Sequence, residues 1–263
     1  MIGAIAGDVI GSVYEGTGFK GRDFPLWHPR SRFTDDTVLT AAVAEHLLTG
    51  EDLVDLFHRA VAAHPDAGYG GTFVQWATQR RREPYGSWGN GSAMRVSPVG
   101  FAAASIAEAM TMAEATAAVT HDHPEGIRGA QAVAVAVVTA RTGGDGDAIR
   151  SAVVREVGYD LDFTLDEIRP TYGFDVSCGG SVPQAIVAAL EADDFEGAVR
   201  NAVSLGGDAD TMASIAGAIA QGAHGVPPEI RERTLGYLDG HLTSVVEAFE
   251  ARYGSGPGVG RPS

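Results

Sequence analysis

The sequence predicts an all-α protein that forms a single compact domain of many helices. Alanine-rich segments dominate the 263 residues, and their apolar side chains recur at the three- and four-residue spacing of a helix. The alternation of apolar and polar residues that marks a strand is only brief anywhere. Without a repeat period or a clear linker, we expect one domain over residues 1–253 and a flexible, Gly- and Pro-rich tail over 254–263.

Periodic apolar segments follow one another along the chain. The segment Leu161–Ile168 fits either a short strand or a helix, and it is left open. The expected helices are Ile2–Tyr14, Thr37–Leu48, Leu53–Ala63, Thr72–Arg81, Ala93–Ala103, Ile106–Val119, Pro124–Arg141, Ala148–Glu156, Val182–Leu190, Phe195–Ser204, Met212–Gly222, Pro228–Leu238 and Thr243–Tyr253.

Composition restricts the class of protein. Hydrophobic residues make up 44% of the chain, as in soluble globular proteins, and no apolar run approaches the roughly 18 residues of a membrane span. The apolar N-terminus lacks a basic region and reaches an acid at Asp8, so it does not resemble a secretory signal. The single cysteine, Cys178, excludes an intramolecular disulfide. We therefore expect a cytoplasmic protein without a membrane partner, and no obligate partner is apparent.

A formal net charge of −15 argues against a protein that coats nucleic acid with a broad basic surface. Only a nucleic-acid target with a very small footprint would escape this penalty. The charge is compatible with an anionic small ligand, because helix N-termini, loop N–H groups or bound cations can hold a phosphate without many lysines.

Two stretches, Phe33–Thr37 and Leu205–Thr211, each place two aspartates and a threonine at the start of an apolar helix. Ordinary N-capping is the alternative explanation, but one cap needs one acceptor, and a second carboxylate adds repulsion. If the fold brings the two stretches together, they form an all-oxygen pocket for hard divalent cations. We favour this metal interpretation.

The first expected helix carries Gly3, Gly7 and Gly11 at four-residue spacing. Because glycine costs about 1 kcal/mol relative to alanine in a helix interior, such a stripe indicates that another backbone packs very close to it. Asp8 and Glu15 would lie on nearly one face if the helix continues. Asp8 fits a hydrogen-bond partner of a neighbouring loop as well as a direct role in the site. Glu15, at the break of the helix, is the better candidate for an acid that does chemistry.

The segment Pro84–Arg95 combines three glycines, an asparagine and two serines before a helix. It would suit a nest of N–H donors for a phosphate, with Tyr85 and Trp88 placed to stack on a flat ring. The alternative is a long loop whose tryptophan covers the core.

The segment Thr120–Glu125 contains two histidines, but no cysteine or third histidine accompanies them at the spacing of a zinc site. We expect Asp122 and Glu125 to cap the following helix, and His121 to reach a phosphate or a hydroxyl. Cys178 has no base beside it in the sequence, which disfavours a nucleophilic role.

Together, in their order and spacing, these motifs resemble the ADP-ribosylglycohydrolase family, which contains the dinitrogenase reductase-activating glycohydrolase. The resemblance extends over nearly the whole chain. It implies an all-helical fold of the ADP-ribosylglycohydrolase type and a site with two divalent cations, Mg²⁺ or Mn²⁺. It also implies hydrolytic removal of ADP-ribose from a mono-ADP-ribosylated target, protein arginine first, by cleavage of the glycosidic bond at ribose C1. The motifs are Gly7–Gly11, Thr34–Thr37, Gly89–Arg95, Thr120–His121, Ser181–Pro183 and Gly206–Thr211.

The resemblance also implies roles for individual residues. Catalysis would involve Glu15, as an acid or base, together with Asp35 and Asp210, while Asp66 is not assigned. The metal ligands would be Thr34, Asp35, Asp36, Asp208, Asp210 and Thr211. The ADP-ribose would contact Ser87, Trp88, Gly89, Asn90, Gly91 and His121.

A mechanism follows as a hypothesis. Cleavage at the ribose C1 passes through an oxocarbenium-like state, and two cations could orient the ribose hydroxyls and lower the pKa of a bound water. Three alternatives stay open. The substrate could carry another linkage, to serine, to a nucleic-acid base or in O-acetyl-ADP-ribose. The protein could be a catalytically silent ADP-ribose binder, or a metal-dependent hydrolase that acts on phosphate.

Overall fold

The computed structural model describes residues 1–254. This part of the chain contains fifteen helices and no strand. The all-α prediction is confirmed, and the expected tail lies outside the described residues except for Gly254. The helices are α1 (Ile2–Gly11), α2 (Asp35–Thr49), α3 (Leu53–Ala63), α4 (Gly71–Thr78), α5 (Gly91–Met94), α6 (Ser97–Ala102), α7 (Ile106–Ala118), α8 (Pro124–Arg141), α9 (Gly146–Val157), α10 (Leu165–Ile168), α11 (Cys178–Leu190), α12 (Phe195–Val203), α13 (Ala209–His224), α14 (Pro228–Leu235) and α15 (Gly240–Tyr253).

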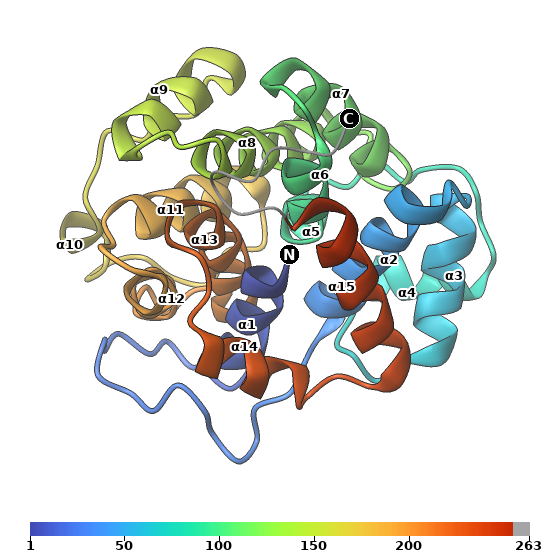
Figure 1. Cartoon of the computed structure of the whole chain (residues 1–263), viewed down its shortest axis with the longest axis horizontal. Coiled ribbons are helices and arrows are strands. Elements are labelled where there is room, and N and C mark those ends of the chain that lie inside the picture. Colours follow the sequence, from blue (N-terminus) through green and yellow to red (C-terminus); the bar gives the residue numbers. More distant parts are fainter. Residues whose placement is uncertain (255–263) are drawn as a thin grey trace.

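Helix α1 lies at the centre of the molecule, and all of its residues are buried (Figure 1). It packs antiparallel against α13, since Gly3 lies against Gly217 and Gly11 lies against Ala209. A Cβ atom added at Gly3, Gly7 or Gly11 would overlap the backbone of α13. The expected close approach of a second backbone is therefore confirmed, and only glycine allows it.

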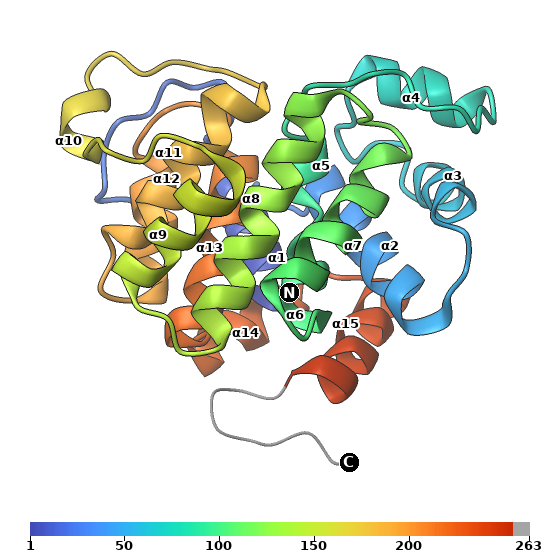
Figure 2. The ribbon, with the colours of Figure 1, turned by 90° about the horizontal axis from the view of Figure 1, so that it is seen from above.

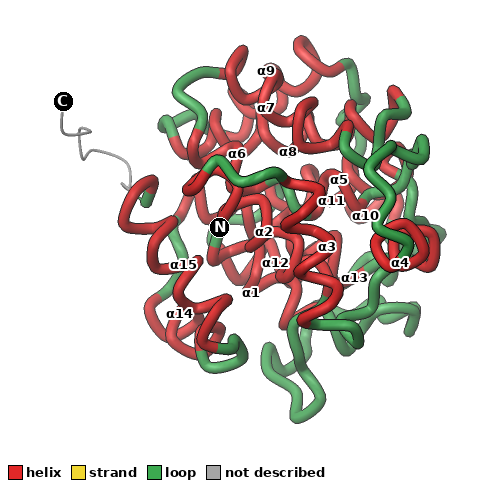
Figure 3. Tube along the Cα trace, turned by 90° about the vertical axis from the view of Figure 1, so that its right-hand side faces the viewer, coloured by secondary structure: helices red, strands yellow, loops and turns green. Residues whose placement is uncertain are grey.

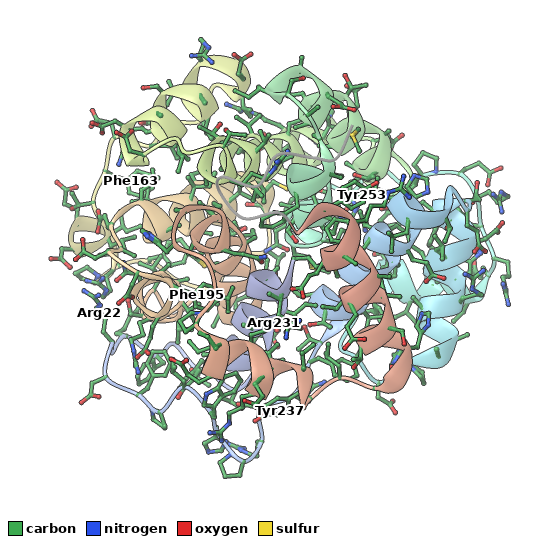
Figure 4. The ribbon with its side chains drawn as sticks, in the orientation of Figure 1. Arg22, Phe163, Phe195, Arg231, Tyr237 and Tyr253 are labelled. Atoms are coloured by element: carbon green, nitrogen blue, oxygen red, sulfur yellow. The ribbon has the colours of Figure 1, made fainter. Side chains whose placement is uncertain are left out.

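The remaining helices surround this central pair. Helices α8, α11 and α12 pack on α13, while α2 and α14 pack on α1 (Figure 2). The buried apolar side chains form one continuous core. Phe195, at the start of α12, points toward α1 (Figure 4), and its ring lies beside Gly3. No helix among the described residues is long and apolar enough to span a membrane.

Two of the expected helices differ from the expectation. Helix α1 ends at Gly11 rather than Tyr14, and the chain then turns through Gly16 and Gly18, which both have positive φ angles. Asp8 and Glu15 therefore do not share a helix face. The expected helix Ala93–Ala103 is broken into α5 and α6, because a proline ring at position 98 would clash with the carbonyl four residues earlier in a continuous helix.

The segment that the sequence left open also becomes defined. Residues 161–164 are irregular, and α10 follows them with a reciprocal capping box between Thr164 and Glu167. Many of the loops lie on one side of the molecule, beside α4, α5 and α10 (Figure 3). The candidate site is built from such loops and from the helix starts next to them.

Candidate active site

A cavity of about 520 Å³ lies between segments that are far apart in the sequence. Its volume is in the range of small-molecule sites. The loop after α1, the start of α2, the loop before α5 and the start of α13 all contribute to its wall. Every site residue expected from the sequence lines this cavity: Glu15, Thr34, Asp35, Asp36, Ser87, Trp88, Gly89, Asn90, Gly91, His121, Asp208, Asp210 and Thr211.

Asp8 links α1 to the start of α2. Its fully buried carboxylate accepts hydrogen bonds from the backbone N–H groups of Thr34, at 2.9 Å, and Thr37, at 3.1 Å. The hydroxyls of the same two threonines also donate to it. Burial raises the pKa of Asp8, and these hydrogen bonds counteract the shift. One of the two interpretations left open, a hydrogen-bond partner of a neighbouring loop, therefore holds for Asp8.

The start of α2 holds Asp36 in the wall of the cavity. Thr34 provides the N-cap, because its hydroxyl oxygen accepts from the backbone N–H of Asp36. Capping therefore does not account for the Asp36 carboxylate. Its Oδ2 accepts from the hydroxyl of Thr211, at 3.2 Å, and lies 3.4 Å from the hydroxyl of Thr34, which donates to Asp8, whereas its buried Oδ1 has no partner among the described residues. Burial, followed by the charge of Asp8, raises the pKa of Asp36 well above its ordinary value.

The start of α13 supplies two further buried carboxylates. Asp208 precedes the helix but makes no side-chain capping bond. Its Oδ2 accepts instead from the Nδ2 of Asn90, at 2.8 Å. The Oδ1 of Asp210 accepts from the backbone N–H of Thr211, at 3.0 Å. Burial raises the pKa of Asp210 well above its ordinary value, and the neighbouring Asp208 adds to the shift.

The carboxylates form two groups, and each group has oxygens within 4.8 Å of one another. Asp8, Asp36 and Asp210 make one group, while Glu15, Asp208 and Asp210 make the other, so Asp210 belongs to both. Asp35 lies outside these two groups although it lines the same cavity. Its pKa is raised to about 7, by burial and then by the charge of Asp8.

So many neighbouring carboxylates repel one another unless they take up protons or share a cation. The donor set consists of oxygens alone, and one of them, Oδ1 of Asp36, is buried without a partner. Hard divalent cations such as Mg²⁺ and Mn²⁺ prefer this type of ligand. The residues present therefore fit a divalent cation. A direct role of Asp8 in the site was the other interpretation left open, and its place in this group is compatible with that role as well.

Glu15 lies at the rim of the cavity, on the turn that follows α1. Desolvation of its carboxyl, and then the charge of Asp208, raises its pKa. A carboxyl with a raised pKa at the mouth of a cavity suits proton transfer to or from a bound molecule.

The loop before α5 does not form the open nest of N–H donors that the sequence suggested. Five of its amides already donate within the protein: Tyr85 and Ser87 to the Thr120 carbonyl, Gly86 to Asp122 Oδ1, Gly89 to Ser87 Oγ and Asn90 to the Val176 carbonyl. Asp122 therefore holds this loop, and the expectation that it caps α8 is wrong. His123 provides that cap.

The cavity lining also includes exposed apolar side chains. Trp88 and Phe174 are each 53% exposed, and Val176 is exposed as well. Trp88 therefore does not cover the core. The contributions of Phe174 and Val176 were missed, since two apolar residues in a polar loop give no periodic signal.

Two further residues, Cys178 and Asp66, belong neither to the carboxylate groups nor to the cavity lining. The buried thiol of Cys178 donates to the Gly89 carbonyl at 3.0 Å, and burial raises its pKa to about 12. Both features agree with a structural role for the thiol. Asp66 is exposed and does not line the cavity.

The fold and the site define an all-helical enzyme with a carboxylate-rich cavity. A family model described as ADP-ribosylglycohydrolase matches residues 1–257. The chain therefore belongs to the ADP-ribosylglycohydrolase family, and the resemblance stated from the sequence motifs is confirmed.

Individual relatives agree with this assignment. The chain is 28% identical over 320 residues to ADP-ribosylhydrolase ARH3 of Homo sapiens, with 90% of this chain and 88% of the relative covered. The same enzyme of Mus musculus is 28% identical over 306 residues, with 86% and 83% covered. A solved structure described as an ADP-ribosylglycohydrolase-related protein complex shares the fold, with a TM-score of 0.65 and 24% identity over 95% of this chain and 96% of that chain.

Proposed function

We propose that this enzyme hydrolyses the bond between the ribose C1 of ADP-ribose and a mono-ADP-ribosylated target, and that the reaction depends on two divalent cations. The ARH3 relatives are named as ADP-ribosylhydrolases, which supports the substrate class. The observation that carries the metal dependence is the buried, unpartnered Oδ1 of Asp36 among carboxylates with raised pKa values.

The cations would be held by the oxygens of the two helix starts. When bound, they supply Lewis-acid stabilisation to the oxygens around them. The ligands would be Thr34, Asp35, Asp36, Asp208, Asp210 and Thr211.

The chain's own groups would then position the substrate and move the proton. Glu15 would hold a proton on its carboxyl, or accept one, at the side of the cavity where the target enters. The exposed face of Trp88 would stack on the flat base of the ligand. Asn90 would orient Asp208 through their 2.8 Å hydrogen bond.

Protein arginine is the target that we propose. A cationic guanidinium suits an acidic protein, with a net charge of −15, and the carboxylate of Glu15 at the rim. Serine, a nucleic-acid base or an O-acetyl group would present the same ADP-ribose half to the cavity, so these linkages are the outcomes that the experiment must separate.

The test is the release of free ADP-ribose from arginine-linked and serine-linked mono-ADP-ribosylated peptides. The protein is first treated with a chelator, and each peptide is then assayed without metal, with Mg²⁺ and with Mn²⁺. Metal-dependent release from the arginine peptide supports the proposal. Release from the serine peptide alone corrects the target, and release without metal contradicts the role of the cations. Binding of ADP-ribose without any release would indicate a silent binder, and release of phosphate a phosphate hydrolase.

A further inference from the structure

Three buried side chains form a chain of hydrogen bonds at the wall of the cavity, where Arg95 and His121 belong to the lining. The Nη2 of Arg95 lies 2.8 Å from the Oγ1 of Thr120, and this oxygen lies 2.7 Å from the Nδ1 of His121. The three residues are only 1%, 0% and 4% exposed. The guanidinium lies over the ring of Phe57 at 4.5 Å and donates to the Thr116 carbonyl, while its Nε and Nη1 atoms have no partner among the described residues.

The direction of these hydrogen bonds follows from the chemistry of the groups. A guanidinium only donates, so the oxygen of Thr120 accepts from Arg95. The Thr120 hydroxyl has no other acceptor among the described residues, so its single proton is directed at Nδ1 of His121, which becomes the acceptor. Burial, and then the charge of Arg95, holds the pKa of His121 well below its ordinary value, so the ring is neutral. A neutral ring that accepts at Nδ1 carries its proton at Nε2.

The Nε2 edge of His121 is the part of the ring that a ligand could use. His121 lines the cavity, and Nε2 takes part in none of the hydrogen bonds among the described residues. Gly91 leaves space at this edge, because a Cβ atom there would lie 3.2 Å from Nε2.

Donors for an anionic ligand are scarce in this cavity. Among residues 1–254, Arg32 and Arg95 are the only lysine or arginine side chains in its lining, and five amides of the loop before α5 already have partners. One more N–H group that points into the cavity would therefore strengthen the binding of a diphosphate, because a hydrogen bond to a charged oxygen is stronger than one between neutral groups.

We propose that Arg95 and Thr120 are positioning residues that fix His121 in its Nε2–H tautomer, so that Nε2–H donates a hydrogen bond to an anionic oxygen of the ligand. The ligand's identity, a diphosphate oxygen of ADP-ribose, rests on the proposed function. The tautomer does not, because it is a property of the free protein.

The first experiment reads the tautomer directly. Two-bond ¹H–¹⁵N spectra of ¹⁵N-histidine-labelled wild-type protein distinguish the two neutral tautomers, and His121→Gln identifies the signals of His121. We expect the Nε2–H pattern in the absence of any ligand. An Nδ1–H pattern, or a ring protonated at neutral pH, would contradict the proposed positioning of His121, whatever substrate the enzyme hydrolyses.

The second experiment removes the middle group of the hydrogen-bond chain from Arg95 through Thr120 to His121. Thr120→Val keeps the shape of the side chain but loses the hydroxyl, and Thr120→Ser restores it. Calorimetric titration with ADP-ribose should show binding weakened by about tenfold or more in Thr120→Val, with recovery in Thr120→Ser. The spectrum of Thr120→Val should also lose the single Nε2–H pattern.

Thr234→Val is the matched control. Thr234 is equally buried, but its hydroxyl donates only to the Ile230 carbonyl of its own helix, and neither residue lines the cavity. Its affinity for ADP-ribose should equal that of the wild type. Unchanged tautomer and affinity in Thr120→Val would contradict the proposal. If wild-type protein binds no ADP-ribose, the ligand assignment and the proposed function fail together, while the wild-type spectrum still decides the tautomer.

Discussion

The hydroxyl of Thr211 donates a hydrogen bond of 3.2 Å to the Oδ2 of Asp36, and this bond joins the start of α13 to the start of α2. The two residues are 175 positions apart. The contact brings the two aspartate-rich motifs to one cavity, yet it leaves the other oxygen of Asp36 buried and unpaired. The fold thus holds buried carboxylates close together, which lowers the free energy of unfolding. A bound cation would offset this cost, so the effect can be measured by comparing the protein with and without metal.

Asp210→Asn should separate function from stability. Asp210 belongs to both carboxylate groups, so its loss should lower metal affinity and reduce the hydrolysis rate by at least about 100-fold. The same change removes one buried like charge, so the chelated variant should melt at a higher temperature than the chelated wild type. Metal titration calorimetry, the release assay and thermal melting test these outcomes. Asp23→Asn, on an exposed loop, is the control. Normal turnover in Asp210→Asn would contradict the metal-site assignment.

The stability of the metal-free protein should fall as the pH rises. The pKa of Asp35 is about 7 in the folded state against an ordinary value of 3.8, so the folded state binds more protons than the unfolded state between these values. The free energy of unfolding should therefore drop by up to about 1.4 kcal/mol per pH unit for each such carboxyl. Asp36 and Asp210 should contribute to the drop in the same direction, since burial also raises their pKa values well above the ordinary value.

Urea unfolding between about pH 4 and pH 8, with a chelator or with saturating Mg²⁺, measures this dependence. Mg²⁺ should flatten the slope, because a cation favours the ionised carboxylates. A chelated protein that gains stability across this window would show that the acidic cluster does not control the pH dependence.

The parts of the fold and site that follow local rules could be predicted from the sequence. The helical period of the apolar residues predicted the all-α fold, and the stripe at Gly3, Gly7 and Gly11 predicted the close contact that α13 makes. The acid pairs at two helix starts predicted one oxygen-lined pocket, and the structure brings them to one cavity. In each case, the signal is a local pattern that can be recognised within its own segment.

The remaining features depend on contacts between segments, which no local pattern encodes. The four donors to Asp8 come from the start of α2, and the partner of Asp122 is an amide 36 positions earlier in the chain. The nest was one of two interpretations of the loop before α5, since its glycines are visible in the sequence whereas the acceptors of its amides are not. The break between α5 and α6 carried a visible signal, Pro98, that the apolar period obscured.

Cys178 should be unreactive in the folded protein. Its thiol is buried, and a pKa of about 12 leaves almost no thiolate at neutral or mildly alkaline pH. A disulfide reagent such as DTNB should therefore react about a thousand-fold more slowly than with a free thiol. The rate should rise to that of a free thiol in denaturant. Rapid labelling of the native protein would indicate that the loop around Gly89 opens readily.

Asp8→Asn tests whether the hydrogen bonds of Asp8 hold the start of α2 in the position that metal binding requires. An amide nitrogen cannot accept from the N–H and hydroxyl groups of Thr34 and Thr37, so the variant should lose about 1–3 kcal/mol of unfolding free energy. It should also bind metal about 10- to 100-fold more weakly, because the start of α2 is no longer held in place. Asp52→Asn is the control, since Asp52 also accepts from two backbone amides but at an exposed helix start. Wild-type metal affinity in Asp8→Asn would exclude the positioning role.

Gly7→Ala tests whether the spacing of α1 and α13 sets the spacing of the carboxylates. The added methyl group would overlap the carbonyl of Ala213, so the helices must separate, at a cost of at least about 1–3 kcal/mol in unfolding free energy. Because Asp8 directly follows Gly7 and Asp210 lies on the opposing helix, metal affinity should fall as well.

The control for this substitution is Gly240→Ala at the start of α15. No atom lies within 4 Å of a Cβ atom there, and alanine favours a helix over glycine by about 1 kcal/mol. The control should therefore melt at or above the wild-type temperature and keep its metal affinity. Equal melting temperatures for Gly7→Ala and the wild type would show that the helix pair has room for a methyl group. Lower stability with unchanged metal affinity would instead show that the carboxylate spacing does not depend on this contact.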